Sequence, residues 1–296
     1  MSFFFCKITK VYIVKIIKKR VVLSQPWGGL GDNLGFSNLP RLYSEQNVKF
    51  HISFLNHSRT KEISNIVWKT NPYVENFKLL LPNIGYEKVH ESGYIPLSDE
   101  FNVIQNINKL HGFDPGNGYP EIYLNKIDKQ FTNEKNSLVV DLNAFSLFNQ
   151  DIYQLNFIND IISEYSKKDA EFLVFPELYQ KNILPENIRI LSIESIEMLI
   201  SVLINTDTFV CLNSGSHSLA AALKNKYSFP KKIICYYPKK NKKNGDYLYD
   251  NVDYEDIVSI KSTAYSDKDK LNINKKIKKS IQMHKRVLYY KSFFGS

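Results

Sequence analysis

Gln25-Pro26-Trp27-Gly28-Gly29-Leu30-Gly31-Asp32-Asn33 is a glycine-rich turn that follows the apolar stretch Val21-Val22-Leu23-Ser24. The apolar stretch predicts a buried strand, and residues 33–45 have the apolar spacing of a helix. A second turn of this kind is Cys211-Leu212-Asn213-Ser214-Gly215-Ser216-His217, between a predicted strand at 208–212 and a helix of small residues. Backbone N–H groups at such junctions can hold a phosphate. The pair of turns predicts two α/β halves that face one cleft.

Predicted strands and helices alternate along most of the chain. Further strands are expected at 48–54, 77–81, 137–142, 171–175, 188–191 and 233–237, with helices at 60–70, 151–166 and 194–204. Pro40 is expected to bend the helix at 33–45 or to delay its start. The stretch 84–120, rich in Gly and Pro, is expected to be a loop beside the cleft. The alternation is typical of parallel-sheet α/β domains, whose ligands bind at the carboxyl ends of the strands.

The polar stretch at 133–136 marks the expected linker between two Rossmann-like domains. We predict an N-terminal domain over 1–133, a C-terminal domain over 134–270 and a basic helix over 271–296. An acidic run at 246–256 is expected to be a solvated loop.

Positive charge is concentrated at the two ends of the 296-residue chain, whose net charge is +9. Residues 1–20 carry six basic side chains and no acidic one, and residues 268–291 carry nine against one. Basic ends suit an anionic membrane surface or nucleic acid, although a Lys-rich composition without any partner explains them equally well. The lysines belong to no recognised nucleic-acid motif, so no nucleic-acid partner is expected.

The three scattered cysteines, Cys6, Cys211 and Cys235, have neither a metal-binding spacing nor a disulfide framework. Lysines interrupt the apolar residues near the N-terminus, so we expect neither a membrane span nor a signal peptide. A cytoplasmic protein is therefore predicted. Peripheral contact with the inner face of the membrane stays open as an alternative.

Asp32 is the first candidate for chemistry. A carboxylate at a helix start can cap the helix, or it can act as a general base, because an unperturbed Asp is ionised at neutral pH. In the second turn, Asn213, Ser214, Gly215, Ser216 and His217 offer backbone, hydroxyl and imidazole donors to a phosphate, or the serines only cap a helix. The dinucleotide fingerprint, the P-loop lysine, the hydrolase elbow and the zinc motifs are all missing from the sequence.

The two turns and their surroundings resemble family 9 glycosyltransferases, the heptosyltransferase-like group with the GT-B fold. One matching segment runs from Arg20 through Gly31-Asp32 to Leu39-Pro40. The other runs from Leu191 through Asn213-Ser214-Gly215 to Leu223. The order of elements agrees over most of residues 20–240.

The resemblance implies an inverting, metal-independent transfer of a sugar, heptose or a related hexose, from a nucleotide-diphosphate donor. The acceptors it implies are hydroxyls of lipopolysaccharide or related surface glycans. No cofactor is expected, because the nucleotide sugar is a co-substrate. The resemblance makes Asp32 the base that deprotonates the acceptor hydroxyl, and it assigns the turn from Asn213 to His217 to the donor pyrophosphate.

Further site residues are predicted from their places beside these elements. Gln150 and Glu177 are expected at the donor, and Gly31, Asn33, Arg59 and Lys61 on the acceptor side. The chain departs from the family pattern at three places: Asn213 stands where Asp is usual, His217 is one position early, and Gln150 stands nearest to a frequent Lys. A sugar- or nucleotide-binding protein without catalysis, and a GT-B-type sugar-nucleotide epimerase, therefore stay as alternatives.

Overall fold

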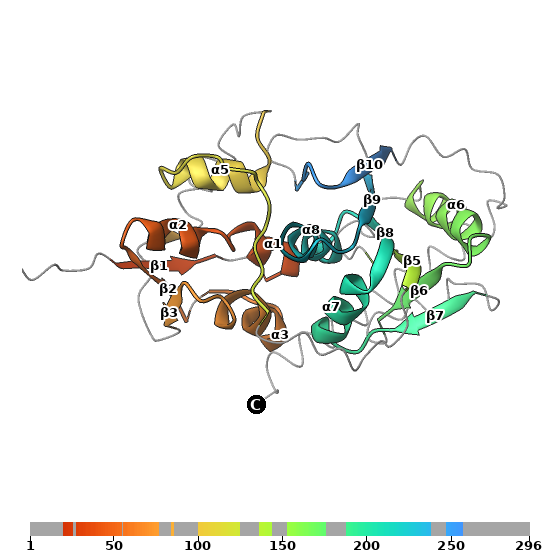
Figure 1. Ribbon diagram of the computed structural model, residues 1–296, viewed down its shortest axis with the longest axis horizontal. Helices are drawn as coiled ribbons and strands as arrows, with labels where there is room; N and C mark the ends of the chain where they lie inside the picture. The colour runs from red at the N-terminus through yellow and green to blue at the C-terminus, as the bar shows by residue number, and fades with distance from the viewer. Residues whose placement is uncertain are drawn as a thin grey trace, which may run out of the picture.

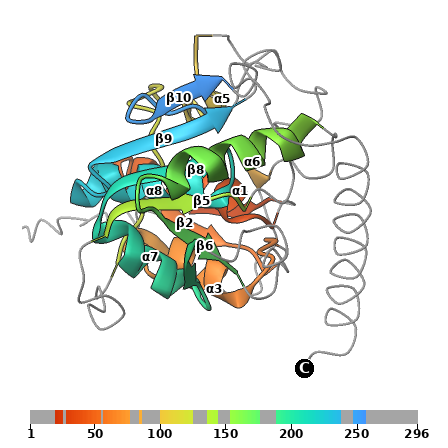
Figure 2. The same ribbon diagram turned by 90° about the vertical axis from the view of Figure 1, so that its right-hand side faces the viewer.

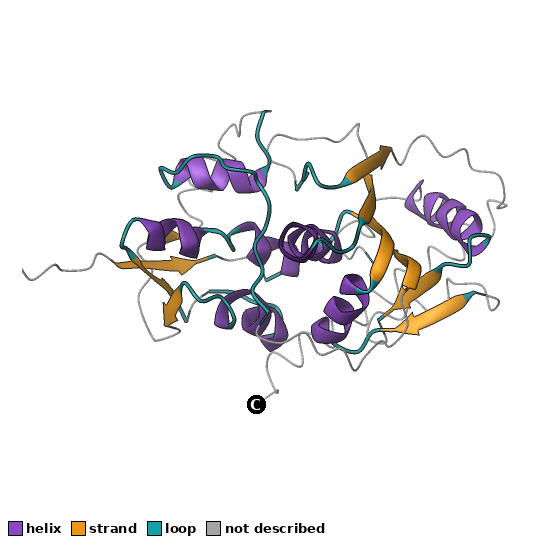
Figure 3. Ribbon diagram, viewed as in Figure 1, coloured by secondary structure: helices purple, strands orange, loops and turns teal. Residues whose placement is uncertain are grey.

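The structure is a computed structural model that describes residues 20–25, 28–54, 56–76, 84–85, 100–124, 136–143, 153–175, 188–237 and 247–256. Two parallel β-sheets stand apart, and helices fill the space between them (Figure 1). Colouring by secondary structure separates the strands into the same two groups, one on each side of the central helices (Figure 3). The predicted α/β class with two Rossmann-like halves is confirmed.

The first sheet has the order β3-β2-β1-β4, and its paired strands are parallel. Its strands are β1 (Arg20–Ser24), β2 (Lys49–Ile52), β3 (Val74–Asn76) and β4 (Ile84–Gly85). Its helices are α1 (Leu30–Gly35), α2 (Leu39–Glu45), α3 (Lys61–Ser64) with the π-helical turn η1 (Asn65–Lys69), and α5 (Val103–Leu110). The helix expected at 33–45 is thus two helices. Pro40 lies in the first turn of α2, where its missing N–H costs no helical hydrogen bond.

The second sheet has the order β10-β9-β8-β5-β6-β7, again with parallel pairing throughout. Its strands are β5 (Asn136–Asp141), β6 (Glu171–Val174), β7 (Arg189–Ser192), β8 (Thr206–Leu212), β9 (Lys232–Tyr237) and β10 (Asp253–Asp256). Its helices are α6 (Tyr153–Ser166), α7 (Ile196–Ile204) and α8 (Gly215–Tyr227). Figure 2 shows α6 in front of the sheet, on the face turned away from the first sheet, whereas α7 and α8 lie toward it in Figure 1.

The two halves share one apolar core. A single cluster of buried side chains runs from Leu23 and Leu34 in the first half to Leu203 and Leu219 in the second. Leu219 to Leu223, with three alanines between them, are fully buried in α8. Small side chains let this helix pack closely against its neighbours. A separate cluster, which includes Ile158 and Ile161, attaches α6 to the outer face of the second sheet.

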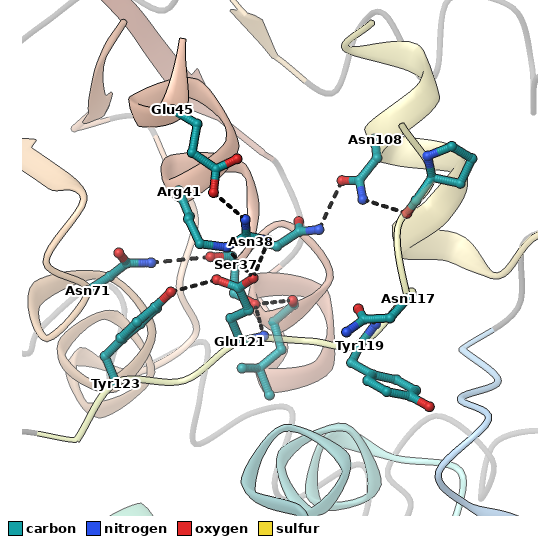
Figure 4. A network of polar contacts seen from close by, with 12 residues as sticks. Ser37, Asn38, Arg41, Glu45, Asn71, Asn108, Asn117, Tyr119, Glu121 and Tyr123 are labelled. Atoms are coloured by element: carbon teal, nitrogen blue, oxygen red, sulfur yellow. Dashed lines mark hydrogen bonds and ion pairs between the residues drawn. The ribbon is translucent and has the colours of Figure 1, made fainter. Parts of the chain in front are cut away.

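A polar network fixes the segment that follows α5 against α2 (Figure 4). Glu121 accepts hydrogen bonds from Arg41 at 2.8 Å and from the Tyr123 hydroxyl at 2.6 Å. The amide of Asn38 donates to Asn108 in α5 at 3.0 Å. Further along the chain, the backbone N–H of Leu124 donates to the hydroxyl of Tyr227 at the end of α8. The segment therefore connects the first half of the molecule to the second.

Three elements correct the predictions from sequence. Residues 84–85, at the start of the expected loop, form β4, because they pair with Leu23 and Ser24 of β1. Residues 103–110, expected to be part of a loop, form α5 because Asn102 caps its N-terminus and Gln105 caps Asn102 in return. Residues 253–256, expected in a solvated loop, form β10 because Tyr254 packs on the apolar core from this edge strand, while Asp253 and Glu255 stay exposed.

Other predictions fall where the structure gives no description. The strand at 77–81, the basic stretch at 1–19 and the helix at 271–296 lie outside the described residues, as do residues 125–135 at the expected domain boundary. Within the described part of the chain, no helix is long and apolar enough to span a membrane.

Candidate active site

The two glycine-rich turns meet at the centre of the molecule, where α1 and α8 pack together (Figure 1). A Cβ atom added to Gly215 would lie 3.0 Å from Cβ of Leu30 and 3.3 Å from the backbone nitrogen of Gly31. Added to Gly31, it would lie 3.3 Å from Oγ of Ser218. Glycine at both positions lets the two helix starts approach this closely, and the predicted facing of the turns is confirmed.

A cavity of about 620 Å³ opens at this junction, and both halves of the molecule line it. The first half contributes Gly29, Leu30, Gly31, Asp32, Arg59 and Ile63. The second contributes Asp141, Asn143, Phe175, Ile196, Leu199, Asn213, Ser214, Gly215, Ser216, Ser218 and Tyr247. A pocket at the carboxyl ends of parallel strands, with a few polar groups among apolar ones, is the usual form of a small-molecule site.

Asp32 holds a defined position at the edge of this pocket. Its Oδ2 accepts a hydrogen bond of 3.0 Å from the backbone N–H of Gly29, and its Oδ1 accepts one of 3.3 Å from the hydroxyl of Tyr247. The first bond caps α1, so the capping role considered from sequence is realised. The carboxylate also lines the cavity, so capping does not remove it from contact with a ligand.

The turn before α8 supplies hydrogen-bond donors on the opposite half. Asn213, Ser214, Gly215 and Ser216 all line the cavity, and the hydroxyls of the two serines lie 2.8 Å apart. The first N–H groups of a helix have no partner within it, and the helix dipole makes this end positive. Because α8 runs for 13 residues, its N-terminus is suited to an anionic group such as a phosphate.

His217 does not take part in this turn, which corrects the prediction from sequence. Its ring is fully buried, hydrogen-bonded through Nε2 to Tyr254 at 2.8 Å and stacked on Tyr249. Burial lowers the pKa of His217 to about 3, so the ring is neutral at physiological pH. His217 is the third residue of α8, and at this position its side chain points into the core instead of into the cavity. His217 therefore stabilises the base of α8.

Asn33 is also a structural residue. Its Oδ1 accepts hydrogen bonds from Gln25, Ser58 and Trp68 at 2.8 to 3.1 Å, and its Nδ2 donates to the carbonyl of Gly29 at 2.9 Å. The side chain is fully buried and does not line the cavity. The expected acceptor-side role is corrected to that of a hub that holds the first turn in place.

Of the other residues predicted on the acceptor side, two lie at the cavity and one does not. Gly31 and Arg59 line the cavity, whereas Lys61 does not. Lys61 is exposed in the first turn of α3, where its side chain extends into solvent. Gln150 and Glu177, expected at the donor, lie outside the described residues.

Three polar residues of the cavity, Asp141, Asn143 and Tyr247, were not predicted from the sequence as site residues. Asp141 and Asn143 lie at the carboxyl end of β5, and Tyr247 lies in the segment before β10. Burial raises the pKa of Asp141, and the nearby hydroxyl of Ser216 and the hydrogen bonds from Asn143 oppose this rise. An acidic residue at the end of an apolar strand was a usable signal for Asp141. Tyr247 carried no such signal, because only the fold brings it to Asp32.

Comparison with solved structures supports the fold. TibC, described as an iron-containing dodecameric glycosyltransferase from enterotoxigenic E. coli H10407, aligns over 92% of this chain and 77% of its own with a TM-score of 0.54 and 12% identity. TibC in complex with ADP-D-beta-D-heptose gives a TM-score of 0.54 and 11% identity over 93% of this chain and 78% of its own. A family 9 glycosyl transferase from Veillonella parvula DSM 2008 aligns over 93% of this chain and 96% of its own, with a TM-score of 0.51 and 9% identity.

The chain therefore has the GT-B fold of the family 9 glycosyltransferases, as the resemblance in sequence implied. No protein-family model matches the sequence, and a search of curated proteins finds no match. In the described part of this chain, no three His, Cys, Asp or Glu side chains are grouped so that they could hold a metal ion.

Proposed function

We propose that this protein is a member of the family 9 glycosyltransferases and transfers a sugar from a nucleotide-diphosphate donor to an acceptor hydroxyl. The observation that carries the proposal is the placement of Asp32 and the N-terminus of α8 in one cavity, each contributed by a different half of the molecule. A carboxylate and a phosphate cradle in a common pocket are the two groups that such a transfer requires.

The reaction is assigned to these groups as follows. The carboxylate of Asp32 takes the proton of the acceptor hydroxyl as its oxygen bonds to the anomeric carbon of the donor sugar. The bond between that carbon and the diphosphate oxygen breaks, and its electron pair leaves with the nucleoside diphosphate. Attack on the face opposite the leaving group inverts the anomeric configuration.

The α8 turn stabilises the leaving group in this proposal. Negative charge grows on the diphosphate as the bond breaks, and the N–H groups of the first helical turn and the hydroxyls of Ser214 and Ser216 are placed to receive it. We propose that this helix end serves in place of a metal ion. We expect the rate of sugar transfer to be unchanged in EDTA. A loss of activity in EDTA that a divalent cation restores would contradict the proposal that no metal ion is needed.

ADP-heptose is the first donor to test, because the complex of TibC contains it. A hydroxyl of a lipopolysaccharide-type or other surface glycan is the proposed acceptor. Arg59 lines the cavity, and the proposal gives it the role of contacting anionic groups of that acceptor. The protein is proposed to act in the cytoplasm. The contact of its basic ends with the inner face of the membrane stays a prediction.

The decisive variant is Asp32→Asn, which keeps the shape of the side chain and removes its basicity. We expect the rate of transfer from ADP-heptose to fall by about 100-fold or more, with the dissociation constant of ADP unchanged within about twofold. The exposed Asp169, in the turn before β6 and outside the lining of the cavity, gives the matched control Asp169→Asn. An unchanged rate of transfer by Asp32→Asn would show that Asp32 is not the general base.

The alternatives make different predictions in the same assays. A binding protein would hold the nucleotide sugar without turnover for any acceptor. An epimerase needs further carboxylates at the donor, and Asp141 is one that lines the cavity. It would convert the donor sugar in the absence of an acceptor, which NMR of the nucleotide sugar alone would detect.

A further inference from the structure

Two buried oxygen atoms beside the cavity have no hydrogen-bond partner among the described residues. They are Oδ2 of Asp141 and Oδ1 of Asn143, on side chains that are 1% and 9% exposed. Both residues line the cavity. A buried acceptor without a donor is unfavourable, so a ligand that supplies hydrogen-bond donors at this point binds more tightly.

The orientation of both side chains is fixed by their other contacts. Oδ1 of Asp141 accepts the backbone N–H of Asn143 at 2.8 Å and also the side-chain amide of Asn143. The same amide group donates to the carbonyl of Leu173 at 3.3 Å. Rotating the Asn143 amide would lose both of its donations, so its oxygen stays unpaired. Asp141 ends β5, which has β8 and β6 on its two sides, so the backbone beneath the pair is rigid.

The chemistry of the pair selects hydroxyl groups. A phosphate oxygen is itself an acceptor and is repelled by an ionised carboxylate, so the diphosphate does not fit here. A metal ion pairs only with the charged carboxylate, which burial disfavours at Asp141. A hydroxyl donates to a carboxylate and also accepts from a carboxylic acid, so it fits both forms.

The location of the pair identifies which hydroxyls are in reach. Ser216, in the α8 turn, is near enough to Asp141 to oppose the rise of its pKa, so the pair adjoins the proposed phosphate cradle. The sugar that is transferred is joined directly to the diphosphate. We propose that Asp141 and Asn143 bind hydroxyl groups of the transferred sugar and thereby select the donor.

This inference rests on the proposed function, and its test separates the two. Calorimetry measures the binding of ADP and of ADP-heptose to the wild-type protein, Asp141→Asn and Asn143→Ala, with Asp169→Asn as the control. The wild type is expected to bind ADP-heptose more tightly than ADP. In Asp141→Asn and in Asn143→Ala, the dissociation constant of ADP-heptose should rise by about tenfold, as expected for the loss of one hydrogen bond to a charged or buried group. The dissociation constant of ADP should change by less than about twofold.

Several results would overturn the inference. An equal loss of affinity for ADP and for ADP-heptose would mean that Asp141 and Asn143 contact the ribose or the phosphates. Unchanged affinity for both compounds would mean that the pair does not contact the ligand. Equal affinity of the wild type for the two compounds would mean that the protein binds the nucleotide but gains no affinity from the sugar, which contradicts the inference and not the proposed function. Failure of the wild type to bind either compound would remove the proposed function together with the inference. Far-ultraviolet circular dichroism and thermal unfolding of each variant check that it folds, and Asn143→Ala tests the pair independently of Asp141.

Discussion

The hydroxyl of Tyr247 donates a hydrogen bond of 3.3 Å to Oδ1 of Asp32, although 215 residues separate the two in the chain. Asp32 lies in the first turn of α1, in the N-terminal half, and Tyr247 belongs to the last described segment of the C-terminal half. Both residues line the cavity, and the backbone N–H of Gly29 donates to the other carboxylate oxygen of Asp32. The proposed base is therefore oriented by both halves of the molecule at once.

Removal of the Tyr247 hydroxyl should reduce catalysis more than binding. In Tyr247→Phe, the carboxylate of Asp32 loses the hydrogen bond from the second half of the molecule and keeps the one from Gly29. Because such a bond contributes about 0.5–1.5 kcal/mol, we expect kcat for sugar transfer to fall about threefold to tenfold, with KM for the nucleotide sugar changed by less than about twofold. Steady-state kinetics on purified protein measure both quantities.

Tyr123→Phe is the matched control, since this hydroxyl pairs with Glu121 away from the cavity. It should leave both constants near the wild-type values. An increase in KM for Tyr247→Phe at constant kcat would show that the hydroxyl binds substrate and does not orient the base.

The close approach of the two turns predicts a large effect of one methyl group. In Gly215→Ala the new Cβ meets Leu30 and the backbone of Gly31 at 3.0 and 3.3 Å, and the backbone cannot rotate away as a side chain can. We expect a loss of about 1–3 kcal/mol in the free energy of unfolding and weaker binding of ADP, because the start of α8 is pushed from its place. Chemical denaturation and calorimetry report the two effects.

Gly35→Ala is the control for this substitution. Gly35 is also buried in α1, but a Cβ there meets Tyr247 at 3.5 Å, an ordinary contact. Alanine also favours the helix, so this variant should be as stable as the wild type or more stable. If Gly215→Ala is as stable as Gly35→Ala, the start of α8 can move away from α1 at little cost, and the close contact is not needed for stability.

The buried imidazole of His217 predicts a specific dependence of stability on pH. Its pKa is lowered by burial to about 3 in the folded state, against about 6.5 in the unfolded chain. Between these values the unfolded chain binds the proton and the folded chain does not. The contribution of His217 is therefore fully present above about pH 6.5 and is lost as the pH falls toward 3, by up to about 1.4 kcal/mol per pH unit.

The variant His217→Gln should remove this part of the slope. Unfolding free energies measured from pH 7 to 4.5 are compared as slopes, because the substitution itself changes stability at every pH. A His217→Gln slope identical to that of the wild type would mean that the ring is protonated in the folded protein.

Much of the fold could be predicted from the sequence because local patterns carry it. Apolar runs such as Val21 to Leu23 mark buried strands, and the glycine turns mark the junctions where strands pass into helices. The elements missed were those whose signals are short or polar. The capping pair of Asn102 and Gln105 lay among loop residues, and the acidic residues of β10 concealed an edge strand.

The site was predicted in part for the same reason. Asp32 and the turn from Asn213 to Ser216 follow directly from the strand-to-helix pattern, and the structure brings them to one cavity. The direction in which a side chain points could not be predicted from the sequence. Asn33 and His217 stand beside cavity residues in the chain, but the helical rotation between adjacent positions turns both side chains into the core.

The sequence by itself determined the two α/β halves, their glycine turns and the carboxylate at the start of the first helix, because each depends on residues close together in the chain. Only the tertiary structure decided that the turns touch through Gly31 and Gly215, that Tyr247 holds Asp32, and that Asp141 and Asn143 present unpaired oxygens to the same cavity. Those relationships join residues far apart in sequence. They arise from the packing of α1 against α8, which local propensity does not encode.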